Sequence, residues 1–230
     1  MSLATRIIAG LAPNQTRQER CIRKFLRFFP RGFHDPKYYA WERGYKIEAH
    51  EKLAGQLNKR AFRQLIEERR FTEIGSIVTR IESRTNLLFS FEKMAFRDAV
   101  RDVAGSEIFA RAFYDLLYAR GHEKPKFEAW CNAISDLPRK QTRVLTHPVV
   151  TVWPFLAQSD RHIFLKPMVT KAAAAEYGFD FVYKSKPSWE VYSSLLRFAE
   201  TLREDLKRLA PRDMIDIQSF IWVLGSSEYR

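Results

Sequence analysis

The side chains that could do chemistry are concentrated between residues 136 and 167, where prolines interrupt the chain and aromatic residues are frequent. Acids, imidazoles, amines and guanidinium groups all occur there: Asp136, Arg139, Lys140, Arg143, His147, Asp160, Arg161, His162 and Lys166. Irregular segments on a rigid scaffold can bring such groups to one point. Cations that alternate with rings such as Trp153 and Phe164 could contact phosphates while the rings stack on bases. The alternative interpretation is that the rings are core and the cations are solvated.

Metal and nucleotide chemistry find no support in the spacing of these residues. His147 and His162 are far apart, and no cysteine or carboxylate stands at ligand spacing beside them. Asp213 and Asp216 could share a metal, but their positions are better suited to the cap and first turn of a helix. The sequence has no P-loop, dinucleotide-binding, serine-hydrolase or zinc-protease motif. We therefore expect neither a metal nor a cofactor.

One enzymatic alternative comes from two short pieces of this segment, LPRKQT at residues 137–142 and DRHI at residues 160–163. Their order resembles the motif of the helix-hairpin-helix DNA glycosylases, in which Leu-Pro precedes a hairpin and Lys-Thr, and Asp-x-His follows. The resemblance implies a base-excision lyase in which Lys140 would be the Schiff-base amine and Asp160 the assisting carboxylate. The glycines of the family's hairpin and its C-terminal cysteine cluster are missing from this sequence.

The net charge of +12 is concentrated in two stretches of the chain. Residues 1–31 carry seven basic side chains against Glu19 alone, and residues 138–171 carry six against Asp160 alone. In the remaining stretches, the positive and negative side chains nearly balance. Because a chain that needs charge only for solubility can spread it, such concentration indicates a polyanionic partner or an anionic site.

Residues 15–29 predict a basic amphipathic helix. At 100° per residue, its cations occupy one third of the circumference and its apolar residues about the opposite half. Three interpretations are open: phosphate binding, a membrane surface, and an ordinary solvated face. The helix is short, and its apolar half is also suited to a protein core, so we expect no membrane contact.

Length and composition favour a folded, intracellular protein. At 230 residues and 46% hydrophobic content, the chain can bury a substantial core, and we expect one helical domain over 1–230 with a seam at 121–126. Cys21 and Cys131 lie far apart in apolar helical contexts, which is typical of core thiols in a reducing compartment. No apolar run is long enough to span a membrane, so we place the protein in the cytoplasm.

The expected fold is mainly α: a compact multi-helix domain with one irregular insert around 139–167, formed by short strands or loops. Asp35, Asn58, Ser188 and Asp213 are the clearest predicted helix caps. Helices are expected at 15–29, 35–57, 58–70, 74–84, 86–103, 106–120, 127–137, 169–177, 188–209 and 213–224. The pattern over 74–103 fits either one long helix or two helices with a break near residues 85–86.

The predicted function is nucleic-acid binding, DNA or RNA, by phosphate contacts from both basic stretches folded into one electropositive surface. The predicted contact residues are Arg17, Arg20, Arg23, Lys24, Arg27, Arg139, Lys140, Arg143, Arg161 and Lys166. The lyase using Lys140 and Asp160 is the enzymatic alternative. A subunit whose cations meet an acidic protein is a third hypothesis.

Overall fold

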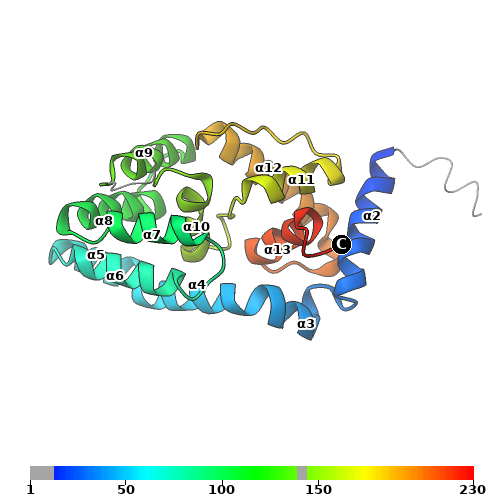
Figure 1. Ribbon diagram of the computed structural model, residues 1–230, viewed down its shortest axis with the longest axis horizontal. Helices are drawn as coiled ribbons and strands as arrows, with labels where there is room; N and C mark the ends of the chain where they lie inside the picture. The colour runs from blue at the N-terminus through cyan, green and yellow to red at the C-terminus, as the bar shows by residue number, and fades with distance from the viewer. Residues whose placement is uncertain (1–12, 139–143) are drawn as a thin grey trace, which may run out of the picture.

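The computed structural model describes residues 13–138 and 144–230, which form a bundle of helices without a strand in either range (Figure 1). The helices are α2 (Pro13–Phe28), α3 (Pro36–Tyr38), α4 (Gly44–Gln56), α5 (Lys59–Glu67), α6 (Phe71–Glu82), α7 (Ser90–Ala99), α8 (Val103–Tyr118), α9 (Glu123–Asp136), α10 (His147–Ala157), α11 (Pro167–Tyr177), α12 (Trp189–Asp205) and α13 (Met214–Gly225). Three short turns accompany them: the 3-10 turns η1 (Gly32–His34) and η3 (Lys207–Leu209), and the π-helical turn η2 (Tyr39–Arg43). The mainly helical fold expected from the sequence is confirmed.

The helices are arranged along one long axis, with α2 at one end and α5, α8 and α9 toward the other (Figure 1). Helix α4 runs along one edge and connects the two ends. Helix α11 packs on α13 in one group, and α8 packs on α6 and α9 in another. Helix α10 lies between these two groups and packs against α4 and α8. No helix in the described ranges is both long and apolar enough to cross a membrane.

Helix starts follow the cap residues that the sequence predicts. The side chain of Asp35 accepts from the Lys37 N–H at 2.9 Å, and that of Asn58 accepts from the Ala61 N–H at 3.0 Å. Ser188 and Asp213 likewise cap α12 and α13. Because these bonds satisfy amide groups that the first helical turn leaves free, a local sequence signal determines where these four helices begin.

The prediction of an irregular or short-stranded insert over 139–167 is wrong for residues 147–157, which form α10. Thr146 caps this helix, and every residue from His147 to Leu156 is buried. A helix that is buried on all sides has no polar face, so its β-branched residues look like a strand in sequence. Only residues 144–146 and 158–166 of the described part of the insert are irregular. Residues 139–143 lie outside the described ranges.

Pro154 stands inside α10 because another residue completes its hydrogen bonding. Proline has no N–H, so the carbonyl four residues earlier, that of Val150, lacks its helical donor. The indole N–H of Trp130 on α9 donates to this carbonyl at 2.8 Å. A tertiary contact therefore stabilises a helix that the local sequence disfavours.

Candidate nucleic-acid interface

Helix α2 has one buried side and one basic side. Cys21, Phe25 and Phe29 are fully buried along its inner side. On the outer side Arg17, Arg20, Arg23 and Arg27 are all exposed. The basic amphipathic helix expected from the sequence is therefore present, with its apolar residues in the protein core.

An aromatic cluster anchors α2 to the body of the protein. The ring centroid of Phe25 lies 4.9 Å from that of Phe33 and 5.3 Å from that of Phe220 on α13. The rings of Phe29 and Tyr38 extend the cluster, with their centroids 5.5 Å apart. Because these aromatic contacts come from three parts of the chain, α2 presents its arginines from a fixed support.

Lys24 helps to hold α2 in place and is not directed into solvent. Its Nζ donates to the carbonyl oxygen of Leu224, near the end of α13, at 2.9 Å, and lies 3.6 Å from the Glu176 carboxylate. A lysine at the carboxyl end of a helix satisfies a free carbonyl and complements the helix dipole. We therefore count Lys24 as an anchor, although the sequence groups it with the phosphate contacts.

The exposed cations of α2 differ in their ion pairing. Arg23 lies 3.5 Å from the Glu19 carboxylate, one helical turn away. Arg17, Arg20 and Arg27 form no ion pair within residues 13–138 and 144–230. The Arg27 guanidinium lies 4.8 Å from the centroid of the Phe28 ring. These three arginines therefore keep their charge available to a ligand.

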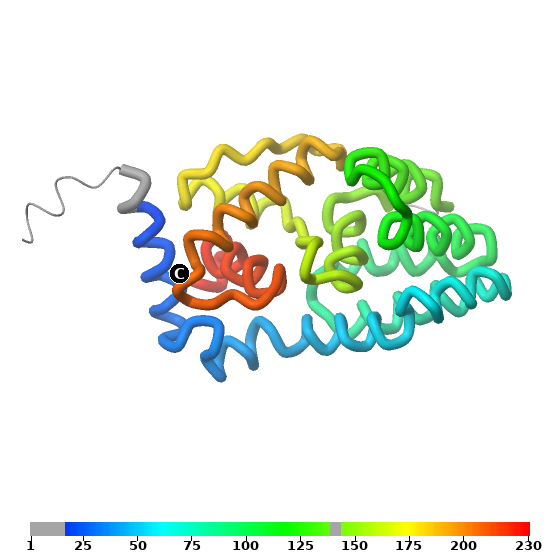
Figure 2. The backbone as a smooth tube through the Cα atoms, turned by 180° about the vertical axis from the view of Figure 1, so that it is seen from behind, coloured from blue at the N-terminus to red at the C-terminus, as the bar shows by residue number. Residues whose placement is uncertain are grey.

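Two further arginines lie near the carboxyl end of α2. The turn after α2 passes beside η3, where a Cβ on Gly32 would lie 3.5 Å from the side chain of Leu209 (Figure 2). Arg31 in this turn and Arg208 in η3 are exposed and form no ion pair within the described part of the chain. We call Arg17, Arg20, Arg27, Arg31 and Arg208 the basic face. Arg208 was not predicted, because nothing local indicates that residues so distant in sequence are neighbours.

A buried network of charges ties α3 and η2 to α13. Arg43, at the end of the π-helical turn η2, donates to Asp213 at 2.7 and 2.8 Å and to Asp216 at 2.8 Å. Asp216 also accepts from the Tyr38 hydroxyl at 2.6 Å and from Arg212. Burial raises the pKa of Asp216, but the bonds from Arg212 and Tyr38 outweigh it, so this pKa lies below its usual value. Asp216 is therefore a structural anion.

A second buried ion pair lies next to this network. The Nζ of Lys46, on α4, donates to Glu42 at 3.1 Å and to the Ser219 hydroxyl at 2.9 Å. The Tyr229 hydroxyl donates to the same Glu42 at 2.6 Å. Burial lowers the pKa of Lys46, and the neighbouring Glu42 opposes this effect. Since each group is hydrogen-bonded, the pair is satisfied and couples α4 to α13 and to the C-terminal residues.

Two described cations of the second basic stretch, Arg161 and Lys166, do not join the basic face. Arg161 lies 3.4 Å from the carboxylate of Glu123, the first residue of α9, away from α2 (Figure 1). Lys166 is buried, and its Nζ donates to the Leu87 carbonyl at 2.8 Å. Burial lowers the pKa of Lys166. Arg139, Lys140 and Arg143 lie outside the described residues.

The lyase residues cannot be assembled into a site from the described part of the chain. Lys140 lies outside it, and Asp160 is exposed, with only its main-chain carbonyl in contact with Arg203 at 3.5 Å. His162 is buried, and its Nδ1 lies 3.0 Å from the Tyr192 hydroxyl. No group of three or more metal-ligating side chains occurs within residues 13–138 and 144–230.

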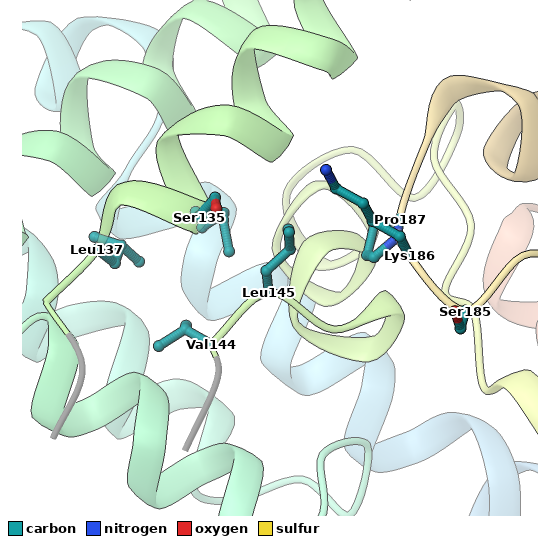
Figure 3. A pocket seen from close by; sticks show the side chains of 8 residues that line it. Ser135, Leu137, Val144, Leu145, Ser185, Lys186 and Pro187 are labelled. Atoms are coloured by element: carbon teal, nitrogen blue, oxygen red, sulfur yellow. The ribbon is translucent and has the colours of Figure 1, made fainter. Parts of the chain in front are cut away.

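A hollow of about 450 Å³ lies between the end of α9 and residues 185–187 (Figure 3). It is lined by Ile134, Ser135, Leu137, Val144, Leu145, Ser185, Lys186 and Pro187. Its described lining contains one amine and two hydroxyls but no carboxylate or imidazole that could act as a base. Cys131 lines a neighbouring hollow, and burial raises the pKa of its thiol to about 12. Neither hollow holds an activated nucleophile in its described lining.

Comparison of the chain with known protein families, with characterised proteins and with solved structures finds no match. Its function is therefore inferred from its own residues.

Proposed function

We propose that the protein binds nucleic acid, with the basic face as the phosphate-contacting surface. The observation that carries this proposal is the set of exposed, unpaired arginines on a helix that is anchored by aromatic packing. Phosphates are bound well by such dispersed guanidinium groups, because bound cations release counterions and no single precise geometry is required.

Two features favour a ligand over a merely solvated face. Some exposed arginines elsewhere pair with neighbouring carboxylates, as Arg63 does with Glu67 at 2.7 Å and Arg111 with Glu107 at 2.8 Å. Others, such as Arg84 and Arg97, form no ion pair within the described ranges. The basic face lacks such pairing among the described residues, and like charges on one helix repel each other by a few tenths of a kcal/mol per pair. A bound polyanion would relieve this repulsion and so stabilise the protein.

The experiment measures fluorescence anisotropy of labelled single-stranded and double-stranded DNA and RNA at salt concentrations from about 50 to about 200 mM. The test variant is Arg17→Ala/Arg20→Ala/Arg27→Ala, which removes three guanidinium groups without touching the core. We expect it to weaken binding and to reduce the slope of log affinity against log salt by about 3. The change in this slope measures how many phosphates the three arginines neutralise in the wild-type complex.

The matched control is Arg63→Ala/Arg111→Ala, which removes two exposed, ion-paired arginines from α5 and α8 and should leave the slope unchanged. Poly-glutamate serves as a second probe, because it carries charge without phosphates or bases. The proposal is wrong if the wild-type protein binds none of the nucleic acids at low salt, or if poly-glutamate binds as tightly as they do. The second result would support the acidic-protein hypothesis instead.

A further inference from the structure

A patch of exposed apolar side chains lies at the start of α7, distant in sequence from α2. Phe89 is 54% exposed, Phe91 49% and Met94 45%. The rings of Phe89 and Phe91 stack with 14° between their planes and 5.7 Å between their centroids. Large apolar side chains that are exposed together indicate a surface with a ligand or partner.

The aromatic pair is held on a rigid support. The Phe89 N–H donates to the Glu92 carboxylate at 3.0 Å, and the Thr146 hydroxyl donates to the other oxygen of Glu92 at 2.9 Å. Lys166, fixed by its bond to the Leu87 carbonyl, places its Nζ 3.6 Å from the Phe89 ring centroid. Binding on these rings would therefore immobilise little that is not already fixed.

Two exposed arginines lie close in sequence to the patch. Arg97 follows Met94 by three residues and so shares its exposed side of α7, and Arg84 lies in the loop that leads to Phe89. Both arginines are exposed, and neither forms an ion pair within residues 13–138 and 144–230. The neighbouring Glu82 and Glu92 are buried and hydrogen-bonded, which leaves half-buried Asp98 as the nearby carboxylate of α7. The patch thus combines flat apolar rings with unpaired guanidinium groups.

We propose that Phe89 and Phe91 form a stacking platform for unpaired bases of a single-stranded nucleic acid, with Arg84 and Arg97 contacting its backbone. This inference rests on the proposed function and names its ligand class. A single strand offers both free base faces and phosphates, whereas the bases of a duplex stack on one another. An apolar protein partner would leave the arginines without a counter-charge, so the charge around the patch favours the nucleic acid.

The experiment compares wild-type protein with three substitutions of the half-exposed Phe91, using a labelled single strand of about 16 nucleotides and its duplex. Phe91→Ala and Phe91→Leu should each weaken single-strand binding by about 5- to 100-fold, because both remove the aromatic face. Phe91→Trp should retain binding, and duplex affinity should be unchanged in all three. Val103→Ala, at a 58% exposed apolar residue beyond the end of α7, is the matched control and should bind like wild type.

The outcomes separate this inference from the function on which it rests. If Arg17→Ala/Arg20→Ala/Arg27→Ala weakens single-strand binding and Phe91→Ala does not, the platform is wrong and the basic face stands. If Phe91→Leu binds like wild type, the site is a general apolar contact and stacking is excluded. A change in the protein's oligomeric state on Phe91→Ala, measured without nucleic acid, would assign the patch to self-association and overturn the platform. Absence of any nucleic-acid binding would remove both proposals.

Discussion

At the scale of single residues, His162 should make stability depend on pH. Burial lowers the pKa of His162 to about 4, from 6.5 in an unfolded chain. Between these values the unfolded state binds a proton that the folded state excludes, so stability should fall as pH falls from 6.5 toward 4. The loss should reach about 3 kcal/mol at the lower end of this range. Urea unfolding at several pH values within it measures the effect.

The variant His162→Asn isolates this contribution, because its amide can still bond to the Tyr192 hydroxyl but does not titrate. Burial lowers the pKa of His147 as well, so wild type and variant should share a residual slope. We expect the difference between the two profiles to develop below pH 6.5. Parallel profiles would show that His162 is not the titrating group.

Single residues also show which parts of the site a sequence can predict. The exposed arginines of α2 were predicted, because the spacing of residues along one helix determines which side each occupies. The burial of Lys166 was not, because its hydrogen-bond partner Leu87 is 79 residues away. The same holds for Arg43 and Asp213, which are 170 residues apart. Asp213 was identified as a cap, but nothing near it in sequence indicates a guanidinium partner.

At the scale of elements, the contact between α11 and α13 depends on Gly225. A Cβ at this position would lie 2.0 Å from the main-chain oxygen of Val169 and 3.0 Å from the nitrogen of Ala173, both in α11. Gly225→Ala should therefore force the helices apart and lower the free energy of unfolding by about 3 kcal/mol. Urea denaturation compares it with Gly55→Ala in α4, where no atom lies within 4 Å of the added Cβ.

The control substitution should change the free energy of unfolding in the opposite direction. Gly55→Ala reduces the freedom of the unfolded chain without a clash and should raise the free energy of unfolding by about 0.5 kcal/mol. Equal effects of the two substitutions would mean that the close approach of α11 and α13 does not constrain stability.

Most helices could be predicted from caps and periodicity, since both are properties of neighbouring residues. The exceptions have a tertiary cause. Helix α10 has no polar side and contains Pro154, and it is completed by an indole N–H from α9. The π-helical turn Tyr39–Arg43 directs Arg43 toward α13, and the sequence predicted one continuous helix through it. In both cases a distant element supplies what the local sequence lacks.

At the scale of the whole molecule, two stretches of the chain with a similar excess of positive charge have different structural outcomes. The first basic stretch places arginines on an exposed helix face, while Arg161 and Lys166 of the second are ion-paired or buried. The concentration of cations in two stretches can be read from the sequence, because it depends only on where the basic residues stand along the chain. Which of them face solvent depends on packing, so the proposed interface is smaller than the predicted one and gains Arg31 and Arg208.

The core continues across the expected seam at 121–126, and the protein should therefore unfold as one unit. Phe109 and Phe113 of α8 pack on Trp130 of α9, with ring centroids 5.6 Å apart in each pair. Phe109 also contacts Trp153 of α10 at 5.8 Å. Because these rings come from both sides of the seam, separating the two sides would expose a shared aromatic core. Far-UV circular dichroism and tryptophan fluorescence should report one coincident thermal transition, with equal calorimetric and van't Hoff enthalpies.

The substitution Trp130→Phe tests this coupling directly. It leaves the buried Val150 carbonyl without the donor that replaces the missing Pro154 N–H, at a cost of about 2 kcal/mol. For a chain of this length the Tm should fall by roughly 4 to 8 °C. In a single cooperative unit, both probes shift together by the same amount. Two resolved transitions, only one of which moves in the variant, would show instead that the chain contains two domains joined at 121–126.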